Sequence, residues 1–425
     1  MTGSRVTFVR LGYLAAIQSG VTVDGKRDQG TDSVTMPYLR VANVQDGHLD
    51  LGSVTEIRVP KAVARSAMLR DGDVLMTEGG DLDKLGRGTV WNSEIKNCLH
   101  QNHVFAVRPN RGKLMPEYLA LITQSSYARA YFESTGTKTT NLASTSSSKI
   151  RDFRIPFVNL DEQRRIVSFL DAETARIDRI VGLRRQQAEL ATSRFAQIIE
   201  GVVAGDRDAL EEIGFRKNSE SWGLGKVARL FALIPGFAFA SDSFVQPGNG
   251  TRLLRGINVA PGRIDWNTET VAWDLDAIPV DKRFRLCLDD LVIGMDRPWI
   301  SGGTRIALVR GSDLPSLLLQ RVACIRTRSK SSTRYLRWVL GSSHFRLALE
   351  SETTGVSVPH ISGEQIGAFT YRLPPPEDQT LLADLLELQQ QHSEAQAELI
   401  DRQLALLAER RQALITAAVT GGITV

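Results

Sequence analysis

Residues 156–205 read PFVNLDEQRRIVSFLDAETARIDRIVGLRRQQAELATSRFAQIIEGVVAG, and this stretch decides the fold of the chain. Apolar or small side chains recur mostly at alternating steps of three and four, which places them on one face of a helix. These side chains are Ile166, Leu170, Ile177, Val181, Ala188, Ala191, Phe195, Ile198 and Val202. Asn159 and Glu162 fit a capping box, and Gly205 stands where a glycine ends a helix. The stretch therefore predicts one long helix with a single apolar seam.

The C-terminal residues 374–425 contain a second copy of this helix. Gln163 and Gln379 lie 216 positions apart, and so do Gly205 and Gly421. Matched apolar positions keep the same offset without a gap, which identifies an internal repeat. These matched positions are Ile166/Leu382, Leu170/Leu386, Leu190/Leu406, Ile199/Ile415 and Val203/Val419.

The duplication extends into the segments that precede each helix. The run YLRVANV at 38–44 matches LLRGINV at 253–259, with Arg40 opposite Arg255. DVLM at 73–76 likewise matches DLVI at 290–293. The chain therefore reads as globule, helix, globule, helix. The predicted bounds are 1–155, 156–205, 206–373 and 374–425.

The totals are those of an ordinary soluble globular protein. Of the 425 residues, 42% are hydrophobic and 24% are charged, and the length allows two to three domains. The three cysteines are widely spaced and odd in number, which fits a reducing cytosol and predicts a cytoplasmic protein. We find no signal peptide and no apolar run long enough to span a membrane. The net charge of +4 and the pI near 9.0 are compatible with nucleic-acid binding but do not require it.

Each globule is expected to be α+β, with short strands separated by Gly, Asp and Asn turns. The expected strands are 37–44, 73–76, 88–91 and 103–108 in the first globule, and 252–259, 291–295, 304–309 and 321–326 in the second. The expected helices are 117–132 and 335–349. A polar loop follows each helix, at 135–149 and 351–361, and is either a linker or a segment that contacts phosphates and bases.

Signatures of catalysis are weak. No G-x-x-x-x-G-K-[ST] occurs, so a phosphate-binding loop of that type is excluded. His100 and His103 have no further metal ligand at suitable spacing, and a surface pair at a strand edge is the preferred interpretation. The sequence DRPW at 296–299 differs by one residue from a methyltransferase tetrapeptide, but no glycine-rich cofactor motif accompanies it. We predict neither a catalytic nor a metal site.

Basic and polar residues in matching turns are the better candidates. Arginine can make bidentate contacts to guanine, and lysine can neutralise phosphates, although a solvated charged rim is about as probable for any single residue. The candidate DNA-contacting residues are Arg40, Lys84, Arg87, Thr137, Lys138, Thr139, Asn141, Arg255, Arg297, Trp299, Arg305, Thr354 and His360.

These features together resemble the specificity subunits of type I restriction–modification systems. The resemblance rests on PFVNLDEQRRI at 156–166, on PPPEDQ at 374–379, on the helix end L-I-x-x-A-V-x-G at 414–421, and on GDVL at 72–75 followed by GRG at 86–88. It covers nearly the whole chain. Phe157-Val-Asn stands where family members often carry prolines, and Asp378 replaces the usual Glu. Both changes are conservative for capping, because acids suit a helix N-terminus.

The resemblance implies a fold of two similar globular target-recognition domains, separated by two long helices packed as an antiparallel coiled coil. Helices of about 43 residues would be about 65 Å long. It implies a non-catalytic DNA-binding chain that reads an asymmetric bipartite site. Glu162, Gln163, Asp378 and Gln379 are then expected at the docking surface for two modification subunits. S-adenosylmethionine, ATP and Mg would belong to those and to possible restriction subunits.

Two other classes stay open at this stage. One is an enzyme in its own right, either a stand-alone DNA methyltransferase or a nuclease, which would need a cofactor or metal site. The other is a coiled-coil scaffold whose globules bind protein instead of DNA. Duplicated helices are compatible with that scaffold, so DNA binding by the chain with its modification partner is the discriminating observation.

Overall fold

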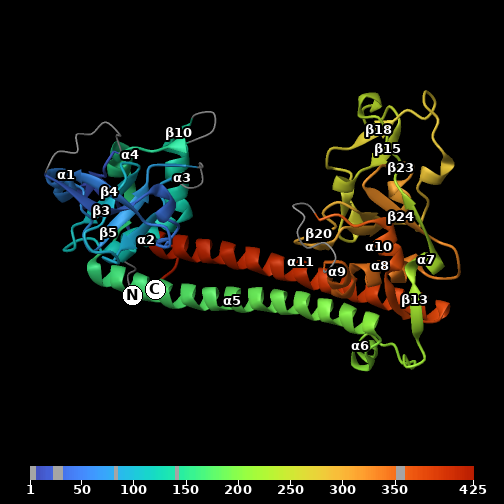
Figure 1. Cartoon of the computed structure of the whole chain (residues 1–425). Helices are drawn as coiled ribbons and strands as arrows, with labels where there is room; N and C mark the ends of the chain where they lie inside the picture. The colour runs from blue at the N-terminus through green and yellow to red at the C-terminus, as the bar shows by residue number, and fades with distance from the viewer. Residues whose placement is uncertain (1–5, 23–31, 81–84, 139–142, 351–358) are drawn as a thin grey trace. The chain divides into compact units, whose positions relative to one another are not determined.

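A computed structural model of the chain describes residues 6–22, 32–80, 85–138, 143–350 and 359–425 (Figure 1). The chain divides into two compact units. Unit 1 comprises Met1–Arg185 with Ile400–Val425, and unit 2 comprises Gln186–Leu399. Each unit contains one mixed globule together with one part of each long helix.

An antiparallel sheet in the order β2-β9-β5-β7 forms the centre of unit 1. Its strands are β2 (Ala15–Ser19), β5 (Asp73–Thr77), β7 (Gly88–Trp91) and β9 (Val104–Pro109). Successive side chains of a strand point to opposite faces. Val74 and Met76 of β5 join one apolar core, whereas Leu75 joins another. Both faces of β5 are thus buried, which explains its continuous apolar sequence.

Helices α2 (Pro116–Gln124) and α3 (Ser126–Thr135) pack on the face of Val74, and a smaller sheet, β4-β3-β8, contributes to the other core. The remaining elements of unit 1 are β1 (Thr7–Arg10), β3 (Ser33–Leu39), β4 (Thr55–Pro60), α1 (Lys61–Ser66), β6 (Gly79–Gly80), β8 (Leu99–His100), β10 (Thr137–Lys138), β11 (Ala143–Ser144), α4 (Ser147–Asp152) and β12 (Arg154–Phe157).

Unit 2 repeats this plan, with a central antiparallel sheet in the order β14-β24-β19-β22 and a smaller sheet in the order β18-β15-β23. The central strands are β14 (Phe231–Pro235), β19 (Leu291–Gly294), β22 (Ile306–Leu308) and β24 (Val322–Thr327). The other elements are α6 (Arg207–Glu212), β13 (Gly223–Lys226), α7 (Val227–Leu230), β15 (Thr251–Leu254), β16 (Val259–Ala260), β17 (Arg263–Ile264), β18 (Val271–Trp273), β20 (Trp299–Ile300), β21 (Gly303–Thr304), β23 (Ser316–Leu318), α8 (Thr333–Gly341), α9 (Ser343–Glu350), α10 (Gly363–Ala368) and β25 (Thr370–Leu373).

A buried ion pair fixes the same strand in both units. Asp73 accepts two hydrogen bonds from Arg108, at 2.7 and 2.6 Å, and Asp290 accepts two from Arg326, both at 2.7 Å. Each carboxylate also accepts a backbone N–H from the turn ahead of its strand. The first pair connects the start of β5 to β9, and the second connects the start of β19 to β24. Loss of either partner would leave a buried charge without compensation, so each pair is expected to be important for stability.

The two long helices, α5 (Leu160–Ala204) and α11 (Pro376–Thr420), each have 45 residues. In unit 1 the start of α5 shares a core with the end of α11, and in unit 2 the end of α5 shares a core with the start of α11. The helices are therefore antiparallel within each unit, and the predicted fold class is confirmed. Among the described residues, no helix combines the length and the hydropathy that a bilayer crossing requires.

The ends of the long helices follow their sequence signals. Asn159 Oδ1 accepts the backbone N–H of Glu162 at 2.9 Å, as expected of an N-cap, and Pro376 is the first residue of α11. Gly205 and Gly421 have φ angles of +76° and +79°, which glycine adopts without strain. The predicted glycine C-caps are therefore confirmed.

The structure corrects the helices that were predicted at 117–132 and 335–349, since each is two helices. The interruptions fall at Ser125 and Ser342, whose backbones are extended, with ψ angles of 153° and 160°. Each serine hydroxyl donates to a carbonyl three residues earlier, at 2.6 and 2.7 Å. A local side-chain hydrogen bond thus replaces a helical one, which helical periodicity does not reveal.

Several predicted strands are shorter than expected. The runs at 37–44 and 252–259 begin as strands, and a 3-10 turn follows in each; Val259 then begins β16. The run at 304–309 is divided between β21 and β22. Within the polar segment 135–149, β10 pairs with β11 and β11 pairs with β6, so these described residues do not form a linker without secondary structure.

Candidate nucleic-acid interface

In unit 2, predicted residues gather on the turn that follows β19. Oδ1 of Asp296 lies 2.6 Å from Nδ1 of His360 and 3.5 Å from Nη1 of Arg321. Arg297 is exposed, with a φ angle of +45°, and its backbone N–H donates to the carbonyl of Pro359 at 2.8 Å. The turn thus brings Arg297 and His360 together, with Asp296 orienting the histidine.

Arg305 stabilises this turn by hydrogen bonds, and Trp299 lies next to it in the sequence. Arg305 Nε donates to the carbonyl of Val259 at 3.0 Å, and its Nη1 donates to the carbonyl of Asp296 at 3.2 Å. Burial lowers the pKa of Arg305, while the nearby carboxylate of Asp296 opposes that effect. Trp299 is half-buried in β20, which pairs with β21. Both side chains are partly buried, so each presents only part of its surface to a ligand.

In unit 1 the corresponding turn follows β5. Oε2 of Glu78 lies 2.6 Å from Nδ1 of His103, whose side chain is exposed. β6 leaves this turn and joins β11 and β10, which carries Thr137 and Lys138 on the surface. Thr137 Oγ1 accepts a hydrogen bond from Lys149 Nζ at 3.0 Å. β6 therefore connects the two residues. Lys138 lies on β10 of the same small sheet, and His103 contacts Glu78 directly ahead of β6.

The other predicted residues of these turns are placed less fully. Arg87 is half-buried, and its carbonyl accepts the N–H of Thr77 at the end of β5. Four predicted residues lie outside the described residues: Lys84, Thr139, Asn141 and Thr354.

The two turns share a basic side chain held by a carboxylate. His103 and Arg321 stand immediately before the equivalent strands β9 and β24, and they pair with Glu78 and Asp296. A carboxylate can accept from cytosine N4, while arginine can donate to guanine O6 and N7. Sequence analysis did not predict DNA contact for any of these four residues. Their positions in the sequence could have indicated them. Each acid closely follows β5 or β19, and each basic residue directly precedes β9 or β24.

Arg40 and Arg255 have a structural role in matching 3-10 turns. Their backbone N–H groups donate to Oδ1 of Asn43 and Asn258, at 2.8 and 3.2 Å, and both asparagines are fully buried. Each guanidinium also donates to a backbone carbonyl of the loop that follows, at 3.2 and 3.1 Å. These contacts explain why the R-x-x-N pattern recurs, and DNA contact by either arginine stays a prediction.

The residues expected at the docking surface divide into two kinds. Gln163 and Gln379 are buried, and their Oε1 atoms accept the backbone N–H of the N-cap residues of α2 and α8, at 2.8 and 2.9 Å. They attach each long helix to its globule, which leaves little surface for a partner. Glu162 and Asp378 form ion pairs within their own units.

His100 and His103 differ from the predicted surface pair. His100 is fully buried, and its Nδ1 donates to the carbonyl of Val104 at 2.7 Å, whereas His103 is exposed. Burial lowers the pKa of His100. Within the described part of the chain, no three His, Cys, Asp or Glu side chains form a group suited to a metal ion.

Comparison with known proteins finds one family. The family model of the type I restriction modification DNA specificity domain matches residues 4–189. The chain is 32% identical over 160 residues to the type I restriction enzyme EcoAI specificity subunit of Escherichia coli, covering 38% of this chain and 27% of that protein. It is 26% identical over 259 residues to the MjaVIII specificity subunit of Methanocaldococcus jannaschii, covering 59% and 58%. The matches thus span less than two thirds of these relatives.

Two solved structures have a similar fold over almost the whole chain. The HsdS subunit from Thermoanaerobacter tengcongensis matches with a TM-score of 0.60 at 19% identity, covering 98% of this chain and 97% of that one. A chain from a structural study of complex assembly and conformational transition of the type I R-M system matches with a TM-score of 0.73 at 19% identity, covering 99% and 98%. At this identity the likeness concerns the fold.

Proposed function

Because this chain belongs to the family of type I restriction–modification specificity subunits, we propose that it selects the DNA sequence on which such a complex acts. Each compact unit reads one half of a bipartite target. The observation that carries this proposal is the pair of matching turns on a duplicated scaffold. Their polar side chains differ, with His103 and Glu78 in unit 1 and His360, Asp296 and Arg297 in unit 2. The two half-sites therefore differ as well.

The exposed groups on these turns suit DNA. Arg297 and His360 supply donors for base edges, and Asp296 supplies an acceptor. Lys138 on β10 supplies a positive charge suited to a phosphate. Such groups on the loops of a rigid sheet are a common arrangement for recognition.

Two copies of a modification subunit dock on the long helices. Unit 1 exposes Leu183 by 58% and Leu406 by 62%, and unit 2 exposes Leu399 by 56% and Leu190 by 62%. The repeat offset of 216 relates Leu183 to Leu399 and Leu190 to Leu406. Exposed apolar side chains in repeated positions favour two equivalent contacts with one kind of partner. Glu162, which is partly exposed, stays a candidate for the edge of these contacts, whereas Asp378 is buried and paired with Lys217.

The chemistry resides in the partners. S-adenosylmethionine binds the modification subunits, and ATP and Mg bind restriction subunits where these join the complex in the cytoplasm. Asp296 of the DRPW sequence is engaged by His360 and Arg321, which favours a recognition role for it. The isolated chain, incubated with labelled S-adenosylmethionine and target DNA, should show no incorporation above background. Incorporation would instead support an enzyme in its own right and direct attention to residues 296–299.

The function is tested by sequencing methylated adenines in a host that carries this gene and its modification partner. The proposal predicts one methylated motif with two different specified halves and an unspecified spacer. The control host carries the modification gene alone and should lack that motif. An unchanged methylation pattern, or a motif without two parts, would overturn the proposal.

A further inference from the structure

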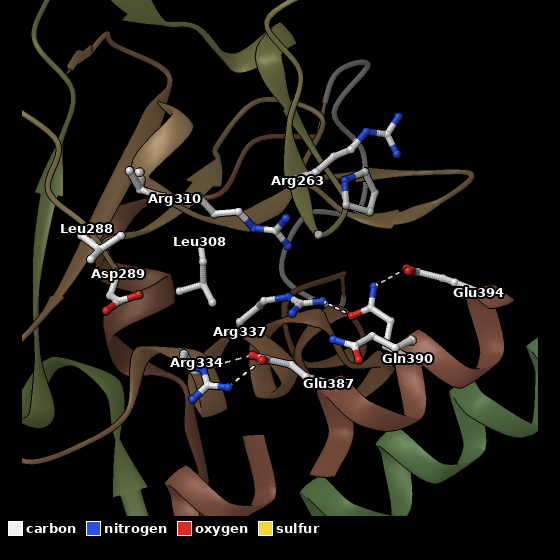
Figure 2. A pocket seen from close by; sticks show the side chains of 15 residues that line it. Arg263, Leu288, Asp289, Leu308, Arg310, Arg334, Arg337, Glu387, Gln390 and Glu394 are labelled. Carbon is white, nitrogen blue, oxygen red and sulfur yellow. Dashed lines mark hydrogen bonds and ion pairs between the residues drawn. The ribbon is translucent and has the colours of Figure 1, made fainter. Parts of the chain in front are cut away.

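Unit 2 contains a cavity of about 560 Å³ next to the first part of α11 (Figure 2). Its walls come from the loop ahead of β17, the end of β22, helix α8 and one face of α11. Four arginines line it, which are Arg263, Arg310, Arg334 and Arg337. The volume is within the range of pockets that bind small molecules.

Arg334 is fully engaged by its neighbours and defines the base of the cavity. Its Nη2 lies 2.6 Å from Glu387 Oε2 and 2.8 Å from Asp384 Oδ1. The hydrogen bond to Glu387 is the main cause of its raised pKa. Both carboxylate oxygens of Glu387 thus accept hydrogen bonds from Arg334. Two further acids line the wall. Glu394 accepts a hydrogen bond from Gln390 at 2.8 Å, and Asp289 is exposed.

Arg310 and Arg337 have no such counter-charge. Only 9% of Arg337 is exposed, and its Nη2 donates to the neutral Oε1 of Gln390 at 2.8 Å. Burial is the main cause of its lowered pKa. The carboxylate of Glu387 opposes that effect, and the positive charge of Arg310 adds to it. The guanidinium of Arg310 extends toward that of Arg337 in Figure 2. Neither forms an ion pair with a described residue. The guanidinium of Arg337 lies over the ring of Trp338, 4.1 Å from its centroid, and the carboxylates of Glu387 and Glu394 attract it without bonding it directly. The buried charge of Arg337 is therefore only partly compensated.

We propose that this cavity binds a phosphate group between Arg310 and Arg337. Guanidinium groups present parallel N–H donors that match phosphate oxygens, and a phosphate has enough oxygens to accept from two of them. Arg263 lies at the rim, where a larger phosphate ester would extend. The phosphate supplies a negative charge that both guanidinium groups can bond directly.

The fold itself does not require these arginines. In unit 1, Ala120 occupies the fifth position of α2 where α8 has Arg337. Asn92 follows the strand β7 where Arg310 follows β22 and Val309. The same scaffold therefore forms without the two charges, which favours a ligand as their reason. The inference does not depend on recognition of DNA by the turns.

Titration of the full-length chain with inorganic pyrophosphate, followed by calorimetry, tests this inference. We expect saturable binding of one pyrophosphate per chain. Arg310→Gln should weaken it about tenfold or more, because one charged hydrogen-bonding group is lost. Arg337→Lys, which keeps the charge but loses the fork, should also weaken it. Arg229→Gln, an exposed arginine of α7 outside the cavity, is the matched control and should bind as the unchanged chain does.

Competition with duplex DNA identifies the source of the phosphate. If DNA displaces pyrophosphate from the unchanged chain, the site takes a backbone phosphodiester. If both bind together, the site takes a free phosphate compound. Absence of saturable binding would overturn the inference, and so would equal binding by Arg310→Gln and the unchanged chain.

Discussion

His100 and His103 stand three residues apart but have opposite surroundings. His100 ends β8 and is fully buried, with a hydrogen bond to the carbonyl of Val104, whereas His103 is exposed beside Glu78. The turn between β8 and β9 separates them. At the scale of the residue, only the fold distinguishes the structural histidine His100 from His103, which is a candidate for DNA contact.

The burial of His100 predicts that the free energy of unfolding of unit 1 falls as the pH is lowered. Its folded pKa lies below the ordinary value, so the unfolded chain takes up this proton first as the pH falls. Its contribution is complete above about pH 6.5 and is lost below that, by at most about 1.4 kcal/mol per pH unit. His100→Asn keeps a donor for Val104 and removes the titration. Urea unfolding between pH 8 and pH 5 should show the unchanged chain losing stability relative to this variant, and a constant difference would contradict the assignment.

Lys138 and His360 predict two distinguishable losses of DNA binding. Lys138→Ala should weaken binding to all sequences alike and reduce the salt dependence by one phosphate contact. His360→Ala should cost about 1–3 kcal/mol and relax the preference at one base of the second half-site. Binding of the assembled complex to single-base variants of the target, at several salt concentrations, separates the two. Equal effects of both substitutions on all sequences would contradict the assignment of His360 to a base.

At the scale of the element, one buried glutamine attaches the start of each long helix to a globule. Gln163→Ala should lower the free energy of unfolding by about 1–3 kcal/mol, because it leaves the N–H of Met115 and the carbonyl of Val158 buried without a partner. Gln186→Ala, on the exposed face of α5, is the control and should change it by less than about 0.5 kcal/mol. Urea unfolding measures both, and equal effects would show that the glutamine is not an anchor.

The exposed leucines predict the stoichiometry of docking. Leu183→Ser and Leu399→Ser remove equivalent apolar contacts, so each should weaken one of the two modification subunits, and the double variant should weaken both. Leu224→Ser is the control, since Leu224 is 78% exposed on β13 and outside the helices. Native mass spectrometry of the mixture should show fewer modification subunits per chain for the helix variants alone. Unchanged two-to-one complexes would place docking elsewhere.

Substitution is preferable to deletion in this test. The last part of α11 supplies Ile415, Ala418 and Val419 to the core of unit 1. Removing residues 377–425 would therefore unfold the globule and abolish assembly for a reason unrelated to docking.

The elements that could be predicted from sequence are those that local patterns determine. The long helices follow from apolar spacing, their ends from Asn159, Gly205 and Gly421, and β5 from its apolar run. The breaks at Ser125 and Ser342 depend on a rotamer that spacing does not encode. The buried glutamines and the histidine–carboxylate pairs join residues far apart in the chain, which no local pattern reports.

At the scale of the whole molecule, one plan occurs twice and recognition is expected to lie in the differences. The two central sheets, the two buried ion pairs and the two R-x-x-N turns correspond element by element. The turns after β5 and β19 carry different polar side chains, and Arg310 and Arg337 of the unit 2 cavity are replaced in unit 1 by Asn92 and Ala120. Duplication therefore supplies the scaffold, and we propose that divergence of the exposed segments supplies the two specificities.

Exchange of one globule tests the central claim most directly. Residues 206–375 are replaced by the matching segment of a relative with a different target, and methylated adenines are sequenced in a host that also carries the modification partner. Both long helices stay intact in this hybrid. The account predicts that the hybrid keeps the half-site read by residues 1–155 and acquires the other half-site of the donor. A motif in which both halves change, or in which neither changes, would contradict independent reading by the two units.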